Sequence, residues 1–215
     1  MRLPSIARGL AFAMSAIQPI VLTGPSGTGK STILTRAMKD YPDKFAFSVS
    51  HTTRSPRKGE IDGIHYFFVT RDQIEEMIKN NEFVEFAEFG GNIYGTSRKA
   101  IEDIQHSGRI CILDVELQGV RNLKRQGLKA KYILIRAPSL DVLKERLLKR
   151  GTETEETIAL RLKHAREDDE AAEKESDLFD DVIVNDELDK AYQEFKGAID
   201  LKPDVENHAN GQNGV

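Results

Sequence analysis

Three glycines, a lysine and four hydroxyl side chains lie within nine residues, 24–32, whose sequence is GPSGTGKST. They match the pattern G-x-x-x-x-G-K-S/T, in which glycines let successive backbone N–H groups point into one concavity at a helix N-terminus. In this pattern Lys30 reaches the β- and γ-phosphates of a nucleotide, and the Ser31 hydroxyl binds the magnesium ion that bridges them. The alternative is a glycine-rich turn that binds nothing. We therefore predict a nucleoside triphosphate site formed by Gly24, Pro25, Ser26, Gly27, Thr28, Gly29, Lys30, Ser31 and Thr32.

A second group of polar side chains follows in residues 50–66, SHTTRSPRKGEIDGIHY. Arg54 and Arg57 lie three residues apart, Lys58 is beside them, and Tyr66 follows shortly after. Two guanidinium groups that converge with a phenol hydroxyl suit a phosphate monoester better than they suit a carboxylate. The same residues also fit a solvated basic loop, so this segment alone leaves both interpretations open.

Short apolar runs predict the strands that position these groups. Residues 19–23, 109–115, 131–136 and 181–184 are continuous apolar runs, and helical stretches separate them. Strands of this kind are typical of a parallel sheet that helices cover on both faces. The predicted fold class is therefore α/β, with a parallel sheet core whose phosphate loop leads from strand 19–23 into a helix over residues 31–39.

The other segments predict two smaller parts. Residues 45–50, 65–69 and 83–89 have strand-like patterns, and residues 72–80 form a short helix capped by Thr70 or Asp72, so residues 45–96 form a small mixed lobe. Residues 139–175 are helical and highly charged. Helices over 97–106 and 188–199 complete the core, which comprises about 18–44, 97–138 and 176–201.

Composition limits the function classes. The chain has 215 residues, of which 39% are hydrophobic and 31% charged, as in an ordinary globular domain, and it contains no apolar run long enough to span a membrane. The net charge of −4 disfavours a nucleic-acid-binding surface, which needs an excess of Lys and Arg. The single cysteine, Cys111, excludes a disulfide within the chain and lies in an apolar run, as expected for a buried thiol.

The two ends of the chain differ from the rest. Residues 1–17 contain Arg2 and Arg8 but no acidic residue, which resembles a mitochondrial presequence in composition; a disordered extension is the alternative. Residues 202–215 are polar and rich in Asn and Gly, which predicts a disordered tail.

Six segments taken together resemble the guanylate kinase family. They follow in the family's order over residues 19–196: GPSGTGKST, SVSHTTRSPRKGEIDGIHYFF, NNEFVEFAEFGGNIYGTS, ILDVELQGV, RGTETEETIALRL and VIVND. The second and third are similar to the GMP-binding lobe of the family, which other phosphate-loop proteins do not share. The resemblance implies one domain over residues 18–201, with a core, a GMP-binding lobe and a mobile helical lid.

The resemblance also implies a GMP site. It assigns the phosphate to Arg54, Arg57, Tyr66 and Tyr94, and the guanine ring to Ser50, Glu85 and Thr96. Guanine's pairing edge carries one acceptor and two donors, so a carboxylate with nearby hydroxyls is its complement, whereas adenine presents the opposite pattern. Sites that read polar groups in this way discriminate by about 10⁴. The full implied set is Ser50, Arg54, Arg57, Tyr66, Glu85, Tyr94, Gly95, Thr96, Asp114 and Glu116.

Two acidic residues follow the strand over 109–115. Asp114 is placed like the carboxylate that supports magnesium in phosphate-loop enzymes, which makes Ser31 and Asp114 the predicted metal ligands. At position 116 the family pattern has an aspartate that contacts the nucleoside, and this chain has Glu116, which keeps the charge on a side chain one methylene longer.

The charged helical segment is similar to the family's lid. Arg146 and Arg150 lie four residues apart, and hence on one helix face, and the resemblance assigns them with Arg161 and Lys30 to catalysis at the transferring phosphate. Without the resemblance, a solvated charged helix is the favoured interpretation. Asn185, after the last core strand, resembles the position near the ATP base.

The family resemblance implies ATP-dependent phosphorylation of GMP to GDP, and of dGMP to dGDP, with Mg²⁺ as cofactor. It implies a monomer in the cytoplasm, while residues 1–17 leave a mitochondrial form open. The alternative is a catalytically inactive guanylate-kinase-like module that binds protein partners. Loss of the phosphate loop would mark such a module, and here Gly29, Lys30 and Ser31 are all present.

Overall fold

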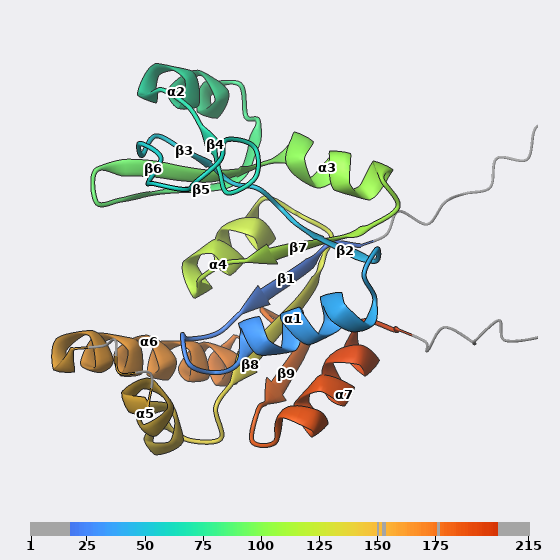
Figure 1. Ribbon diagram of the computed structural model, residues 1–215, viewed down its shortest axis with the longest axis vertical. Helices are drawn as coiled ribbons and strands as arrows, with labels where there is room; N and C mark the ends of the chain where they lie inside the picture. The colour runs from blue at the N-terminus through green and yellow to red at the C-terminus, as the bar shows by residue number, and fades with distance from the viewer. Residues whose placement is uncertain (1–17, 150, 152–153, 176, 202–215) are drawn as a thin grey trace, which may run out of the picture.

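The computed structural model describes residues 18–149, 151, 154–175 and 177–201, and its core is a five-stranded sheet (Figure 1). The strand order is β2-β7-β1-β8-β9, and every neighbouring pair is parallel, which confirms the predicted core. The core strands are β1 (Ile20–Thr23), β2 (Phe45–Phe47), β7 (Ile110–Asp114), β8 (Lys131–Arg136) and β9 (Asp181–Val184).

Helices cover both faces of this sheet, because successive side chains of a strand point to opposite sides. Ile20 and Leu22 belong to a buried cluster with residues of α1 and α7, whereas Val21 between them joins residues of α3 and α4. Figure 1 shows the same two layers on either side of the sheet. The helices are α1 (Lys30–Asp40), α3 (Arg98–His106), α4 (Leu117–Arg125) and α7 (Leu188–Ala198).

The carboxyl edge of the core sheet gathers the residues expected to bind ATP. The chain leaves β1 into the phosphate loop, β7 ends at Asp114, and Asn185 follows β9. The central strand β1 pairs with β7 on one side and β8 on the other. Open parallel sheets bind ligands at such a point, where connections leave in opposite directions.

A second sheet forms the predicted lobe, with the strand order β4-β3-β6-β5 and a hairpin between β5 and β6. The Thr70 side chain accepts from the N–H of Gln73, whose side chain in turn accepts from the N–H of Thr70, so a capping box begins α2. Ile74 of α2 packs on Phe83 and Ile93 of the hairpin. The lobe elements are β3 (His51–Thr52), β4 (Phe67–Phe68), α2 (Arg71–Lys79), β5 (Phe83–Phe89) and β6 (Asn92–Ser97).

The structure corrects the predicted start of the lobe. We predicted one strand over residues 45–50 as part of the lobe, but β2 pairs with β7 in the core sheet, with Phe45 opposite Ile110. Phe45 is buried with Ile20 of the core. The Ser48 N–H still donates to the Ile112 carbonyl at 2.9 Å, and the chain enters the lobe only after that bond. Apolar alternation does not reveal which sheet a strand joins, so the sequence placed it on the wrong side of the boundary.

The charged segment forms two helices, α5 (Leu140–Lys149) and α6 (Glu155–Lys174), which extend beyond the carboxyl edge of the sheet (Figure 1). Leu143 and Leu147 of α5 pack against Ile158 and Ala165 of α6. The C-terminal half of α6 lies on the core, where Ala171 joins the cluster of α3 and α4. No helix of the described ranges is both long and apolar enough to cross a membrane. The predictions for residues 1–17 and 202–215 fall outside those ranges.

Candidate active site

Two glycines of the phosphate loop occupy positions where a side chain would clash. Gly24 has a φ of 132°, and a Cβ added to it would lie 2.0 Å from the carbonyl oxygen of Ile135. Gly29, the residue before α1, has a φ of 96°, and its Cβ would lie 2.2 Å from Nδ2 of Asn185. The loop backbone is thus held closely against the ends of β8 and β9, at a helix N-terminus that favours an anion.

Buried side chains support the same loop from behind. The Thr28 hydroxyl donates to the Pro25 carbonyl at 2.9 Å, and the Asn185 amide donates to the Thr28 carbonyl at 2.7 Å. Thr28 is fully buried and Asn185 is 5% exposed. Asn185 therefore fixes the loop in this structure, and its predicted position near the ATP base stays a prediction.

The Lys30 ammonium lies over the loop at the edge of the sheet. It donates to the carbonyl oxygens of Gly24 and Pro25, and it is 4.0 Å from Oδ1 of Asp114. Burial raises the pKa of the Asp114 carboxyl group, and the positive charge of Lys30 opposes this rise. The loop carbonyls thus hold Lys30 beside the position where phosphates bind in the loop pattern.

A cavity of about 640 Å³ opens in front of the loop. The loop, the end of β7, the start of α4 and one face of α6 line it, so core and lid contribute to the same space. Its lining residues are Gly24, Pro25, Ser26, Gly27, Gly29, Lys30, Ser31, Thr32, Asp114, Val115, Glu116, Leu117, Gln118, Arg121, Arg161, His164, Glu167 and Asp168.

This cavity brings together most of the predicted ATP and metal residues, but not all of the predicted lid arginines. Arg161 lines it, whereas Arg146 lies outside it and donates to the Asp186 carbonyl at 3.3 Å. Arg150 falls outside the described residues. Asp114 and Glu116, predicted for GMP, also line this cavity.

The predicted guanine-binding residues form a hydrogen-bonded row in the lobe. Thr96 donates to Oε1 of Glu85 at 2.9 Å, and its hydroxyl lies 3.5 Å from that of Ser50. β5 and β6 place Glu85 opposite Thr96, and β3 pairs with β6 next to Ser50. Burial raises the pKa of Glu85, while the hydrogen bonds from Thr96 lower it. The row offers acceptor and hydroxyl groups on one surface, which complements a guanine edge.

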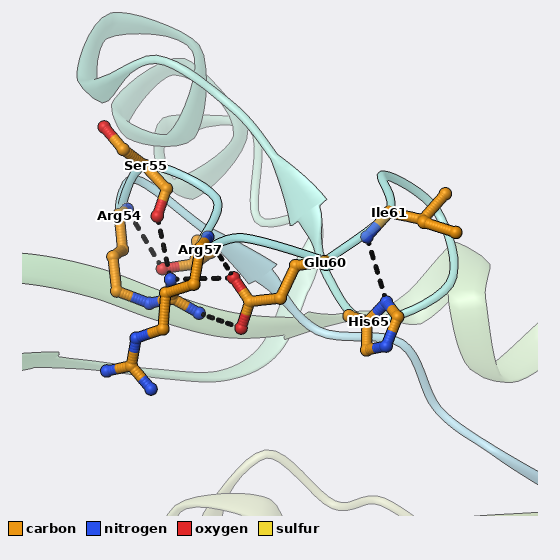
Figure 2. Close-up of polar contacts among 7 residues, drawn as sticks. Arg54, Ser55, Arg57, Glu60, Ile61 and His65 are labelled. Atoms are coloured by element: carbon orange, nitrogen blue, oxygen red, sulfur yellow. Dashed lines mark hydrogen bonds and ion pairs between the residues drawn. The ribbon is translucent and has the colours of Figure 1, made fainter.

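The predicted phosphate-binding residues Arg54 and Arg57 both contact a carboxylate that the sequence did not reveal, Arg54 through its side chain and Arg57 through its backbone (Figure 2). Both oxygens of Glu60 accept from the Arg54 guanidinium at 2.9 Å, and Oε2 also accepts from the Arg57 backbone N–H at 2.6 Å. Arg54 donates further to the Ser55 carbonyl at 2.8 Å. These bonds lower the pKa of Glu60 to about 2, with the Arg54 hydrogen bond as the largest cause.

The aromatic side chains expected at the GMP phosphate lie next to this arginine. The Arg54 guanidinium carbon is 5.3 Å from the centre of the Tyr66 ring, and the rings of Tyr66 and Tyr94 are 6.1 Å apart. Figure 2 shows the Arg57 guanidinium directed away from Glu60. Glu60 thus holds the guanidinium of Arg54 by two hydrogen bonds. Arg54, exposed Arg57 and the two tyrosines lie in one region of the lobe.

Sequence reasoning missed three charged residues at these sites: Glu60, Arg121 and Asp168. Glu60 lies three residues after Arg57 in a glycine-containing loop. This spacing favours a contact between the carboxylate and a nearby residue, but it does not indicate which residue. Arg121 lines the cavity from α4 and pairs with Glu175 at 2.5 Å. Asp168 lies two turns beyond Arg161 on α6, and this spacing would have placed both on one face.

The residues around the loop fit a magnesium ion bound mainly through phosphates. Ser31 and Asp114 supply the hard oxygen ligands that Mg²⁺ prefers, and both line the cavity beside Lys30. Within the described ranges no group of three or more His, Cys, Asp or Glu side chains is arranged to hold a metal.

Fold and site together define a phosphate-loop kinase that acts on a small phosphorylated acceptor. The guanylate kinase family model matches residues 16–202, and this chain belongs to the guanylate kinase family. It is 53% identical to guanylate kinase from Homo sapiens over 86% of this chain and 94% of the human one. It is 47% identical to the Schizosaccharomyces pombe enzyme of the same name, over 84% and 89%.

Solved structures share this fold. A crystal structure of guanylate kinase from Anaplasma phagocytophilum is 29% identical, with a TM-score of 0.59 and 86% of each chain covered. The SH3-kinase fragment of tight junction protein 3 has a TM-score of 0.50 at 14% identity, which shows likeness of fold alone. The relatives thus agree with the class that the cavity and the lobe define.

Proposed function

We propose that this chain transfers the γ-phosphoryl group of MgATP to the phosphate of GMP, producing ADP and GDP. One observation carries the proposal: a phosphate-loop cavity that contains Lys30 and Arg161 lies in the same domain as a lobe with a guanine-complementary row. Family membership and the high identity to guanylate kinases support the same reaction.

The acceptor needs no general base. The second pKa of a phosphate monoester is near 6, so the attacking oxygen of GMP is already ionised at neutral pH. The protein must hold two anions in line and neutralise the charge on the transferring group. Lys30 moves from the loop carbonyls to the β- and γ-phosphates, and Arg161 faces them from the lid.

Ser31 and Asp114 would hold Mg²⁺ between the loop and the end of β7. The ion, when bound, neutralises phosphate charge and orients the triphosphate. Arg146 and Arg150 approach the transferring phosphate when α5 and α6 close over the cavity. That closure excludes water, which would otherwise accept the phosphoryl group.

The lobe selects the acceptor. Arg54, Arg57, Tyr66 and Tyr94 bind the GMP phosphate, and Glu85 accepts from the N1–H and amino groups of guanine. Ser50 and Thr96 offer hydroxyls to the ring, and Asp114 and Glu116 contact the nucleoside. Gly95 lies between Tyr94 and Thr96, and a Cβ at this position would lie 2.8 Å from the Phe83 ring. None of these contacts requires a 2′-hydroxyl, so dGMP is an acceptor as well. By analogy with the family, we propose a cytoplasmic monomer.

The proposal is tested by ADP formation from MgATP with GMP, dGMP, AMP, CMP and UMP supplied separately. We expect rapid turnover with GMP and dGMP and at least about 10³-fold lower kcat/KM with AMP. Equal turnover with all acceptors would contradict the role of the lobe. GMP binding without turnover would instead favour a non-catalytic binding module.

A further inference from the structure

Asp168 is a buried carboxylate in the nucleotide cavity that the proposed reaction does not use. It is 6% exposed, lies on α6, and lines the cavity together with Lys30. Within the described ranges no side-chain hydrogen bond involves its carboxylate, and its oxygens are not among the fully buried atoms that lack a partner, since the group opens into the cavity. Buried carboxylates are normally paired or hydrogen-bonded, so this one calls for an explanation.

Asp168 and Lys30 line the same cavity, where the Lys30 ammonium is also 4.0 Å from Oδ1 of Asp114. Burial raises the pKa of Asp168 to about 7, the Lys30 ammonium opposes that rise, and the nearby carboxylates of Asp169, Glu116 and Glu167 add to it. The charged or titratable groups that line this cavity are Lys30, Asp114, Glu116, Arg121, Arg161, His164, Glu167 and Asp168.

The position of Asp168 is fixed by the core rather than by the lid. Asp169 pairs with Arg136 of β8 at 3.3 Å, and Glu175 at the end of α6 pairs with Arg121 of α4. Ala171 is buried against the core. Arg161 lies seven residues earlier, about 10 Å along the helix axis, where α6 packs on α5. The Asp168 carboxylate therefore lines the cavity from the part of α6 that is attached to the core.

We propose that Asp168 is a positioning residue that supplies a counter-charge for Lys30 when no nucleotide is bound and competes with the nucleotide phosphates for that lysine. The inference rests on the proposed binding of ATP at the phosphate loop. The carboxylate limits nucleotide affinity in two ways, because it attracts the lysine that must turn to the phosphates and it repels the phosphates themselves. It thereby favours release of ADP after transfer.

The test is calorimetric binding of MgADP to the wild-type protein and to Asp168→Asn at pH 8, where the wild-type carboxylate is ionised. We expect the variant to bind MgADP about three- to tenfold more tightly, because one negative charge has been removed near the phosphates. The KM for ATP falls while the KM for GMP is unchanged. Asp168→Glu, which keeps the charge, retains affinity near that of the wild type.

Glu170→Gln is the matched control, since it removes one charge from the same helix at an exposed position that does not line the cavity. We expect it to leave MgADP affinity unchanged. Unchanged or weaker binding in Asp168→Asn overturns the inference, and weaker binding would indicate that the carboxylate contacts the nucleotide or its metal instead. Failure of the wild type to bind MgADP would overturn the proposed function itself. A melting curve of each variant separates these results from misfolding.

Discussion

The two proposed phosphate sites of this molecule are built by opposite means. Backbone forms the phosphate loop, where Gly24 and Gly29 allow a close approach to the ends of β8 and β9. Side chains make the site in the lobe, where Arg54 and Arg57 stand on a loop between β3 and β4. A backbone site reads only the triphosphate, whereas a side-chain site can be combined with a base-reading row.

Each site also contains an acidic residue, Glu60 in the lobe and Asp168 in the cavity, and the two carboxylates differ in their hydrogen bonding. Glu60 accepts three hydrogen bonds, two from Arg54 and one from the Arg57 backbone, and its pKa is lowered to about 2. Asp168 is buried without a hydrogen bond in the described structure, and its pKa is raised to about 7. The comparison predicts opposite effects: removal of Glu60 weakens its site, whereas removal of Asp168 strengthens the other.

The largest effect within the lobe is expected at the guanine row. Glu85→Gln replaces an acceptor with an amide that cannot accept from both guanine donors. We expect kcat/KM for GMP to fall about a hundredfold, which corresponds to about 3 kcal/mol, with a smaller change for AMP. Steady-state kinetics with both acceptors measures this. Glu88→Gln is the control, because Glu88 lies on the same strand but is exposed and paired with Arg71. Unchanged discrimination between GMP and AMP in Glu85→Gln would contradict the role of the row.

A smaller effect is expected at the carboxylate that holds Arg54. Glu60→Gln removes the bidentate acceptor, so the guanidinium is less well oriented, and we expect the KM for GMP to rise about tenfold with the KM for ATP unchanged. Glu75→Gln in the same lobe breaks an exposed ion pair with Arg71 and should change neither constant. A lower KM for GMP in Glu60→Gln would break the comparison, because Glu60 would then compete with the phosphate as Asp168 does.

The smallest effect concerns the stability of the lobe. His51 lies between Phe67 and Phe83, with ring centres 4.8 and 5.5 Å away, and burial lowers its pKa although Glu82 and Asp62 oppose this. The unfolded chain therefore binds a proton at His51 more readily than the folded chain does, so this residue lowers stability as pH falls below about 6.5. Between pH 7.5 and pH 5.5, the melting temperature of His51→Phe should fall less steeply than that of the wild-type protein. An equal decline in both proteins would contradict this role.

Much of this architecture could be predicted from the sequence, because its signals are local. The strands β5, β8 and β9 have the predicted bounds. β6 was not predicted as a strand, because Gly95 and the turn before it break the apolar pattern, and it becomes a strand by pairing with β5 and β3. The assignment of β2 to the core likewise depends on pairing with distant β7.

In the candidate site, too, local features could be predicted from the sequence and contacts between distant residues could not. The phosphate loop could be predicted because backbone chemistry requires particular residues at fixed spacing. Glu60 could not be assigned, because its role depends on a turn that brings a carboxylate back onto Arg54. Asp168 could not be assigned either, since its proposed role depends on its place in the same cavity as Lys30, which lies 138 residues earlier in the chain. The Asn185 side chain supports the loop from β9, another contact that only the fold creates.

Lys30→Ala tests the account most directly, because it removes a charged side chain of the phosphate-loop cavity and leaves the lobe unchanged. We predict that turnover with GMP falls at least about 10³-fold, since a charge that stabilises the transferring phosphate is lost. Calorimetric affinity for GMP should stay within about twofold of the wild type, because the lobe binds it independently. Lys39→Ala, at the exposed end of α1, is the control. Near-normal turnover in Lys30→Ala, or loss of GMP binding together with turnover, would contradict the account.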